Sequence, residues 1–283
     1  MSGLLSRARG LFALRLRKDF NFRRAQETVP ALRWLKPRKG ERILDIGCGE
    51  GTYDYRVALR GARVFGFDLD RNQLRRAQAY HKTPSTGFVC AHADAFPLRS
   101  GQFDTVMSLC VFEHLPDDRQ TLREMWRVLQ PGGRILLTLD SLSLKEIGES
   151  WRDEHRERHS VLQFYSHPSV GSLLEACGFR LIRHRYLLRS RMDLALIRLS
   201  YATERMHAVP AAVIRLGLVT AGRMVSAVFN LFTGNQRGWT LLIEADRMTP
   251  GSGPGPSSGP DPGSGPSPDP GPEPGPGQSN PPS

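Results

Sequence analysis

Short apolar segments alternate with segments of helical periodicity along the chain from about residue 41. This alternation is typical of a parallel sheet with helices on both faces, because each pair of parallel strands needs a crossover connection. The segments that predict strands are residues 42–46, 63–68, 87–92, 103–109, 134–140, 179–188 and 239–245. The sequence therefore predicts an α/β fold with a seven-stranded, mostly parallel sheet.

Two of the helices between the later strands have clear boundary signals. Residues 117–130 carry apolar side chains at helical spacing, and this helix is expected to end at the Pro-Gly-Gly turn of residues 131–133. A second helix is expected to start near Ser166, with Pro168 in its first turn, and to end at Gly178.

The long connection between the last two predicted strands, residues 190–236, is rich in aliphatic residues interrupted by arginines. It predicts two amphipathic helices that meet near Pro210. Its longest uncharged stretch, residues 224–236, has 13 residues, whereas a membrane span takes about 20, so we expect that this insertion does not cross a bilayer. Three interpretations stay open: a lid over a lipophilic substrate that also contacts a membrane, a dimer interface, or a self-packed helical hairpin.

The two ends of the chain differ in composition from the middle. Pro, Gly and Ser make up 29 of the 34 residues of 250–283, which predicts a disordered tail. Residues 1–29 form a basic segment with apolar residues at helical spacing, at Leu4, Leu5, Ala8, Leu11 and Phe12. This amphipathic helix is expected to lie on an anionic membrane surface or to pack on the domain, and its arginines faintly resemble a mitochondrial transit peptide. Residues 30–249 are the expected folded domain.

Basic residues outnumber acidic residues, with 39 Lys and Arg against 28 Asp and Glu. This excess would suit a nucleic acid or an anionic membrane surface. The basic residues do not alternate with aromatic residues, however, so we expect no nucleic-acid partner. The four cysteines are too few and too far apart for a disulfide framework or a CxxC metal site, which indicates a reducing compartment such as the cytoplasm.

The first predicted strand leads into a glycine-rich turn, in which Gly47, Gly49 and Gly51 alternate with other residues. Glycine lets the backbone turn tightly and leaves no side chain between the backbone and a ligand. The second predicted strand ends at Asp68, 21 residues after Gly47, where a carboxylate can accept hydrogen bonds from a ribose diol. The GxGxG spacing, with Asp45 two residues before the first glycine, favours a nucleoside over a dinucleotide with a pyrophosphate.

Five segments occur in a characteristic order: ILDIGCGEG at 43–51, VFGFDLD at 64–70, HADAFPLRSGQFDTVMSLCVFEHLPD at 92–117, REMWRVLQPGGRILLTLD at 123–140 and FYSHPSVGSLLEACGF at 164–179. Together they resemble the class I S-adenosylmethionine-dependent methyltransferases, in particular the branch that methylates quinones, sterols and fatty acids. The departures are Asp70, where that family often has Ser or Thr, and the bulky Tyr53 and Tyr55. The resemblance implies a Rossmann-like fold with S-adenosylmethionine as the cofactor.

The resemblance also implies which residues of the turn contact the cofactor: Asp45, Gly47, Cys48, Gly49 and Gly51. Asp45 would orient the methionine end, while Gly47 and Gly49 would present their backbone to the methionine and the ribose.

Further along the chain, the resemblance implies that Asp68, followed by Leu69, holds the ribose diol. Asp94 would accept a hydrogen bond from adenine N6, and the backbone N–H of Ala95 would face adenine N1. The methionine ammonium would be received by the main chain at the end of the fourth strand, at Leu109 and Cys110.

Methyl transfer needs a nucleophile in line with the methyl group and, for a hydroxyl or a carbon acid, a base. His114, beside Glu113, follows the fourth strand at the carboxyl edge of the sheet, where ligands bind in such folds. His159 precedes an aromatic pair in a segment that borders the substrate pocket of related enzymes. We expect His114 or His159 to be the catalytic base; the alternatives are a turn cap and a solvated helix. His155 and His159 lack further ligands, so no metal site is expected.

These features predict a cytoplasmic methyltransferase that acts on a small, lipophilic acceptor, with peripheral attachment to an anionic membrane surface left open. Two alternatives stay open as well: a methyltransferase that acts on nucleic acid or protein, and a non-catalytic protein that binds S-adenosylmethionine. The sequence gives neither the acceptor atom nor the oligomeric state.

Overall fold

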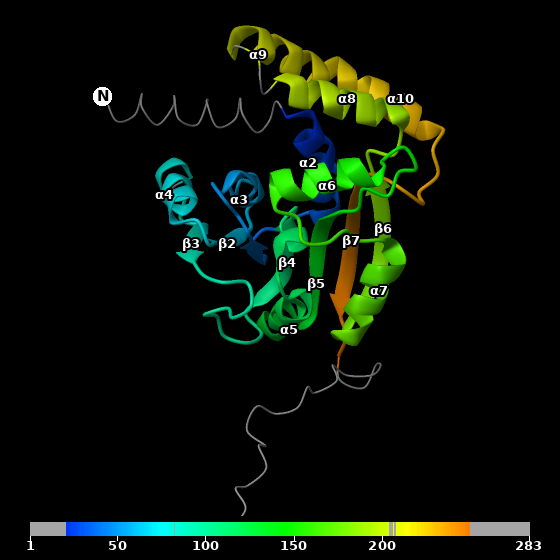
Figure 1. Cartoon of the computed structure of the whole chain (residues 1–283). Helices are drawn as coiled ribbons and strands as arrows, with labels where there is room; N and C mark the ends of the chain where they lie inside the picture. The colour runs from blue at the N-terminus through cyan, green and yellow to red at the C-terminus, as the bar shows by residue number, and fades with distance from the viewer. Residues whose placement is uncertain (1–20, 82, 204–205, 207, 250–283) are drawn as a thin grey trace, which may run out of the picture.

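The computed structural model describes residues 21–249, apart from residues 82, 204–205 and 207. Two expected features, the amphipathic helix around residues 4–12 and the disordered tail 250–283, lie outside the described residues and stay predictions. In the described part, helices cover both faces of a central sheet (Figure 1).

The strands in the described residues are β1 (Arg42–Ile46), β2 (Arg63–Asp68), β3 (Thr86–Cys90), β4 (Phe103–Leu109), β5 (Leu129–Asp140), β6 (Phe179–Leu187) and β7 (Thr240–Arg247). They form a 7-stranded sheet in the order β3-β2-β1-β4-β5-β7-β6. Every neighbouring pair from β3 to β5 is parallel, whereas β7 is antiparallel to both β5 and β6. The expected seven-stranded, mostly parallel sheet is therefore confirmed.

The helices of the described residues are α2 (Phe22–Leu35), α3 (Thr52–Ala58), α4 (Arg71–Tyr80), α5 (Asp118–Val128), α6 (Glu149–His159), α7 (His167–Ala176), α8 (Arg191–Ala202), α9 (Ala208–Gly217) and α10 (Arg223–Leu231). A single 3₁₀ turn, Phe112–His114, follows β4, and a π-helical turn, Leu218–Gly222, joins α9 to α10. The expected start of α7 is confirmed, because the Ser166 hydroxyl accepts a hydrogen bond from the Ser169 N–H and Pro168 lies in the first turn.

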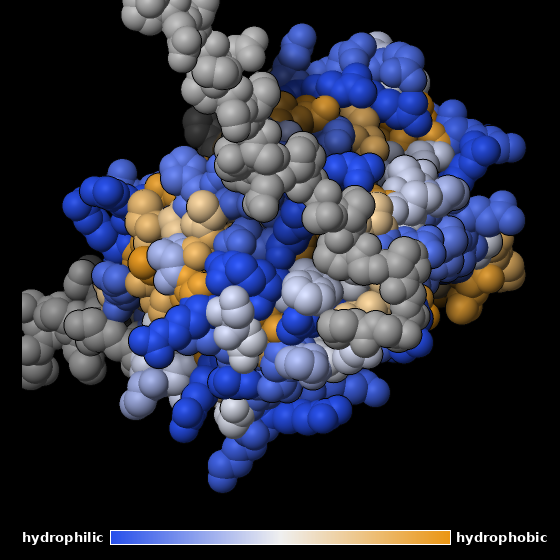
Figure 2. All heavy atoms as spheres, turned by 90° about the horizontal axis from the view of Figure 1, so that it is seen from below, coloured by the Kyte–Doolittle hydropathy of each residue, from blue (hydrophilic) through white to orange (hydrophobic). Residues whose placement is uncertain are grey.

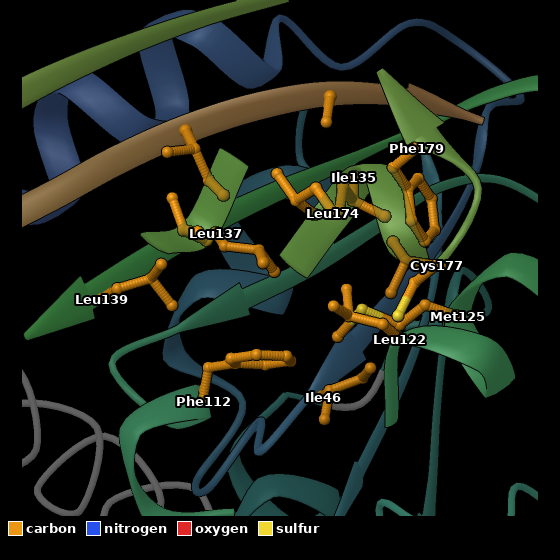
Figure 3. Close-up of a cluster of buried hydrophobic side chains, with 14 of the residues drawn as sticks. Ile46, Phe112, Leu122, Met125, Ile135, Leu137, Leu139, Leu174, Cys177 and Phe179 are labelled. Carbon is orange, nitrogen blue, oxygen red and sulfur yellow. The ribbon is translucent and has the colours of Figure 1, made fainter. Parts of the chain in front are cut away.

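The two faces of the sheet are covered by different helices because side chains alternate along each strand. In β5, Leu137 belongs to a core cluster with residues of α5 and α7, whereas the adjacent Leu136 belongs to a cluster with residues of α2 and α3. Figure 3 shows the first of these clusters, in which Phe112 after β4 faces the same interior as Leu122 of α5.

The boundary between α5 and β5 differs from the expected one. The helix expected over residues 117–130 ends at Val128, and Leu129 is already extended and pairs with Phe103 of β4. The register then shifts before Arg134 pairs with Thr105, with Gly132 at a φ of 76° in the irregular part. Pairing with β4, a long-range interaction, therefore extends β5 back past the Pro-Gly-Gly turn.

The insertion between β6 and β7 consists of α8 followed by one continuous helix, Pro210–Leu231. The expected pair of helices that meet near Pro210 is found, because α8 ends at Ala202 and α9 begins at Ala208, with Pro210 in its first turn, where a proline costs no hydrogen bond. The expectation that the insertion is too short to span a membrane needs correction. This helix has 22 residues and by length and composition alone could cross one, with 17% of its apolar window buried in the domain.

The expected boundary between residues 29 and 30 falls inside α2. Phe22, Arg23 and Glu27 are buried against the sheet and α8, so the packed domain includes the residues from Phe22 onward. The change in composition that set the expected boundary therefore does not coincide with the start of the packed domain.

Replacing Leu137 by Ala tests the larger core cluster. Leu137 is fully buried in the middle of β5, so we expect the free energy of unfolding to fall by about 2–5 kcal/mol, from lost apolar burial and the cavity left behind. The same substitution at Leu162, whose side chain is 58% exposed, should change it by about 0.5 kcal/mol or less. Denaturant unfolding measures both, and equal losses would contradict the assigned core.

Candidate active site

The glycine turn after β1 fits closely against the segment that follows β4. Gly47 has a φ of 71°, and a Cβ atom there would lie 2.4 Å from Cγ2 of Val111. The N–H groups of Gly47 and Cys48 both donate to the carbonyl of Phe67 at the end of β2. The turn is thereby held at the carboxyl ends of β1, β2 and β4, and only a residue without a side chain fits at position 47.

The Asp68 carboxylate is oriented by two backbone groups. Its Oδ2 accepts a hydrogen bond from the Gly49 N–H at 2.8 Å, and its Oδ1 accepts one from the Asp70 N–H at 2.9 Å. Each carboxylate oxygen can accept a second hydrogen bond, so Asp68 is fixed in place and still able to receive a diol. The Asp70 side chain instead caps α4 by accepting from the N–H groups of Asn72 and Gln73.

A cavity of about 430 Å³ lies beside Asp68 at this edge of the sheet. Its exposed lining is largely apolar, although six polar side chains contribute to it, and comes from the ends of β1 and β2, the segment after β3, the segment after β4 and the start of α5. The lining residues are Ile46, Gly47, Phe67, Asp68, Leu69, Ala91, His92, Ala93, Asp94, Val111, His114, Leu115, Pro116, Asp117 and Thr121. Size and lining suit a nucleoside with a planar base.

The structure brings four of the expected cofactor residues to this cavity, namely Gly47, Asp68, Leu69 and Asp94, together with the candidate base His114. Ala95 is exposed beside it, and the next N–H, that of Phe96, is already donated to the Glu124 carboxylate. The Asp94 loop is held by Gln120, whose side-chain amide donates to the Asp94 carbonyl. The assigned roles of these residues stay predictions.

The other expected cofactor residues lie next to the cavity without lining it. Asp45 and Cys48 are buried at the turn, and Gly51 begins α3, where a Cβ atom would lie 2.8 Å from the Phe88 ring. Leu109 and Cys110 are buried at the end of β4. Their roles in cofactor binding stay predictions.

The Cys110 thiol belongs to a buried polar network. It donates to the Glu27 carboxylate at 3.3 Å, and the Cys110 N–H donates to the Thr138 hydroxyl at 2.9 Å. Burial and the negative charge of Glu27 raise the pKa of Cys110, so this thiol stays protonated. An ammonium only donates hydrogen bonds, so a carbonyl of this segment would have to receive it, and that role stays a prediction.

A cluster of charged residues that the sequence did not reveal lies at the end of β5. Asp140 accepts hydrogen bonds from His155 Nε2 at 2.7 Å and from Arg23 Nη1 at 3.3 Å, and Glu27 accepts from the Thr240 hydroxyl at 2.7 Å. Burial alone would raise the pKa of Asp140, but the His155 hydrogen bond and the charge of Arg23 lower it. An acid at the end of a predicted strand was the available signal for this cluster.

The candidate base His114 is held by Ser160 and lies beside Glu113. His114 Nδ1 lies 3.0 Å from the Ser160 carbonyl, and His114 Nε2 lies 3.9 Å from Glu113 Oε1. Burial and the charge of Asp140 raise the pKa of Glu113 well above its ordinary value. Among the described residues, Glu113 Oε2 has no hydrogen-bond partner.

The second candidate, His159, does not line the cavity. Its ring packs against His155, with centroids 4.6 Å apart, and against Tyr201 of α8, and its Nε2 has no hydrogen-bond partner in the described residues. His155 Nε2 is committed to Asp140. Within residues 21–249 as described, no group of three or more His, Cys, Asp and Glu side chains is placed to hold a metal ion.

The fold and this cavity define a class: a Rossmann-like domain whose antiparallel last strand lies between β5 and β6, with a nucleoside site at the carboxyl edge of the sheet. Residues 44–137 match the family described as "Methyltransferase domain". These residues belong to the class I S-adenosylmethionine-dependent methyltransferases.

Three curated relatives show the extent of the similarity. The chain is 31% identical over 141 residues to malonyl-[acyl-carrier protein] O-methyltransferase of Hahella chejuensis (49% of this chain, 50% of that protein). It is 38% identical over 108 residues to 27-O-demethylrifamycin SV methyltransferase of Amycolatopsis mediterranei (36% and 40%). It is 30% identical over 128 residues to ubiquinone biosynthesis O-methyltransferase of Pseudomonas putida (43% and 55%). The chain spans about half the length of the curated relatives it matches.

Solved structures share the fold at low sequence identity. Phosphoethanolamine N-methyltransferase 2 of Haemonchus contortus, in complex with S-adenosyl-L-methionine, matches with a TM-score of 0.59 and 19% identity, over 78% of this chain and 52% of that chain. The [4+2]-cyclase SpnF matches with a TM-score of 0.56 and 20% identity, over 80% and 81%. Proteins of this fold therefore differ in the reactions for which they are named.

The half-buried position of His159 predicts a pH dependence of stability. Burial and the neighbouring His155 lower the pKa of His159 to about 4, whereas a histidine in an unfolded chain has a pKa of about 6.5. The unfolded chain therefore binds this proton more readily, so the free energy of unfolding should decrease as pH falls from about 6.5 to about 4. Denaturant unfolding at several pH values should show a weaker decrease for His159→Gln. The control variant His92→Gln, at an exposed position, should keep the wild-type dependence of the unfolding free energy on pH. The same dependence in His159→Gln as in the wild type would contradict this assignment.

Proposed function

We propose that this protein binds S-adenosylmethionine and transfers its methyl group to a small, lipophilic acceptor. The observation that carries this proposal is the cavity of about 430 Å³ with Asp68 fixed at its edge. Asp68 retains acceptor capacity for a ribose diol, and Gly47 lines the cavity with its backbone alone. The apolar cavity beside Asp94 suits an adenine ring.

When bound, S-adenosylmethionine supplies a sulfonium methyl group that is already activated toward nucleophiles. The task of this chain is then to align an acceptor and, where the acceptor is a hydroxyl or carbon acid, to remove its proton. His114 lines the cofactor cavity and is therefore the better placed of the two candidate bases.

The Ser160 carbonyl determines the tautomer of His114. A carbonyl only accepts hydrogen bonds, so His114 Nδ1 carries the proton and Nε2 keeps its lone pair when the ring is neutral. Nε2 is then the atom that takes a proton from the acceptor. Glu113 Oε1 lies 3.9 Å from Nε2, beyond hydrogen-bond distance, and its raised pKa favours the neutral acid, so Glu113 is given no part in this proton transfer.

The named relatives support a small acceptor with an oxygen nucleophile. The Hahella chejuensis and Pseudomonas putida proteins are both named O-methyltransferases. The apolar insertion above the domain supports a lipophilic acceptor and peripheral attachment of a cytoplasmic enzyme to a membrane. An oxygen acceptor on a lipophilic molecule is therefore the first to test.

Incubation with methyl-labelled cofactor and separated lipids, small metabolites, RNA and protein tests the proposed reaction. Label in the lipid or small-metabolite fraction supports it. Label in RNA or protein would replace the proposed acceptor with a macromolecule. Cofactor binding without labelling of any fraction would contradict transfer, a relevant outcome because the [4+2]-cyclase SpnF shares this fold.

Replacing Asp68 by Ala tests the cofactor site. The substitution removes two charge-assisted hydrogen bonds to the ribose, each worth about 1.5–3 kcal/mol, so we expect the Kd for S-adenosylmethionine to rise about 100-fold or more in calorimetry. Asp70→Ala is the matched control, because Asp70 caps α4 and does not line the cavity. An unchanged Kd for folded Asp68→Ala would contradict the ribose assignment.

Replacing His114 by Ala tests the base. With the fraction that accepts label as the substrate, we expect kcat to fall about 100-fold, while the Kd for the cofactor changes little. His159→Ala is the comparison, since His159 lies outside the cavity. The reverse pattern would make His159 the base, and equal losses of binding and rate would mark His114 as structural.

A further inference from the structure

The last helix of the insertion, α10, is attached to the domain along one face by polar contacts. Asp193 of α8 is fully buried and accepts hydrogen bonds from the Ser226 hydroxyl and, at 2.8 Å, from the Asn230 amide. Gln26 of α2 also donates to Ser226. A helix held in this way cannot leave the domain to cross a bilayer without exposing a buried carboxylate.

The opposite side of α10 is apolar and exposed. Met224, Leu231 and Phe232 are 74%, 79% and 84% exposed, and Val228 lies between them. By contrast, the opposite end of the molecule, seen from below in Figure 2, is largely hydrophilic with smaller apolar areas. One polar, attached face and one apolar, exposed face are the features of a helix that lies in the plane of a membrane interface.

A groove of about 580 Å³ runs between α2, the end of β6 and α10, directly beside these apolar residues. Met224 and Leu231 form part of its wall. Its lining contains four arginines and, among the described residues, no acid: Arg33, Arg185, Arg189 and Arg223.

Contacts within the protein account for the position of one of these arginines but not for the positions of the other three. Arg189 donates to the carbonyls of Asn230, Thr233 and Gly234 and so closes the end of α10. Arg33, Arg185 and Arg223 form no ion pair with the described residues. Gathering like charges raises the free energy of the folded state, and an anion in the groove would remove this repulsion.

A second groove, of about 770 Å³, continues from the first on the other side of α2 and shares Val29 and Arg33 with it. Its lining adds three basic residues and again no acid within the described residues: Lys36, Arg56 and Arg60. The exposed part of α2 therefore lies between two acid-free basic grooves. Because its basic residues are spread over two grooves, such a surface attracts a flat anionic membrane more strongly than a single small ion.

We propose that the groove between α2, β6 and α10 binds the phosphate headgroup of an anionic phospholipid, while the exposed side of α10 enters the acyl boundary. Arg33, Arg185 and Arg223 contact the phosphate, and Met224 and Leu231 contact the first methylene groups. This binding site gives a location and a lipid class to the membrane attachment in the proposed function, and it rests on that attachment but not on the methyl transfer. A nucleic acid would match the charges but would leave the apolar rim in water.

Flotation of the full chain with phosphatidylcholine vesicles, with and without phosphatidylglycerol, tests this site. We expect binding to the anionic vesicles at low salt and weaker binding as the salt concentration rises. The double variant Arg185→Glu/Arg223→Glu should reduce that binding about 30-fold or more. Arg99→Glu/Arg123→Glu makes the same charge change at two exposed positions outside the groove and should retain most of the binding.

A second variant separates the apolar contribution. Leu231→Ser should weaken binding to anionic vesicles at all salt concentrations, since it removes an exposed apolar side chain and no charge. Thermal unfolding and calorimetry with S-adenosylmethionine should be unchanged in these variants, because the groove and the cofactor cavity share no lining residue.

Four outcomes would overturn the proposal. The first is equal binding to neutral and anionic vesicles, and the second is an equal loss of binding in the two double variants. The third is calorimetric binding of inorganic phosphate without vesicle binding. The fourth is binding of RNA, and not of vesicles, with that RNA binding abolished in Arg185→Glu/Arg223→Glu. Failure of methyl transfer with vesicle binding intact would contradict the proposed function and leave this site standing.

Discussion

A buried carboxylate, Asp140 at the end of β5, determines how the helices sit on the carboxyl edge of the sheet. Transferring a charge into a protein interior costs several kcal/mol unless partners surround it. Here the partners come from α2, through Arg23, and from α6, through His155. The nearby Glu27 extends the network to Cys110 after β4 and to Thr240 of β7. One network thus links two helices and three strands at the carboxyl edge of the sheet.

The sequence was informative wherever local signals and burial agreed. The expected bounds of β1, β2 and β4 are those found, because each is a short apolar run that ends at a turn or a loop. The start of β5 was missed, because Leu129 is extended only through its pairing with Phe103, a long-range contact that helical spacing does not report. The burial of Arg23 was not predicted either, because it depends on ion pairs with Glu27 and with Asp140, which comes from a distant strand.

The candidate site likewise has one part that could be predicted from the sequence and one part that could not. The glycine turn and Asp68 could be predicted because the turn and the acid each follow a strand by a fixed number of residues, and parallel strands bring their carboxyl ends together. The environment of His114 could not, since its partner Ser160 lies 46 residues further along the chain. The family match covers residues 44–137, whereas α6 and the insertion lie beyond it. The residues within the family match could therefore be predicted from a shared pattern, whereas those of α6 and the insertion could not.

The π-helical turn between α9 and α10 sets the orientation of everything that follows it in the insertion. Each residue advances a regular helix by about 100°, so one residue more or less in Leu218–Gly222 would rotate α10 by that angle about its axis. Ser226 and Asn230 would then turn away from Asp193, and the outward side chains would turn toward the domain. The length of this turn therefore determines the rotation of α10 about its axis, and with it which side of α10 packs on the domain and which side faces outward.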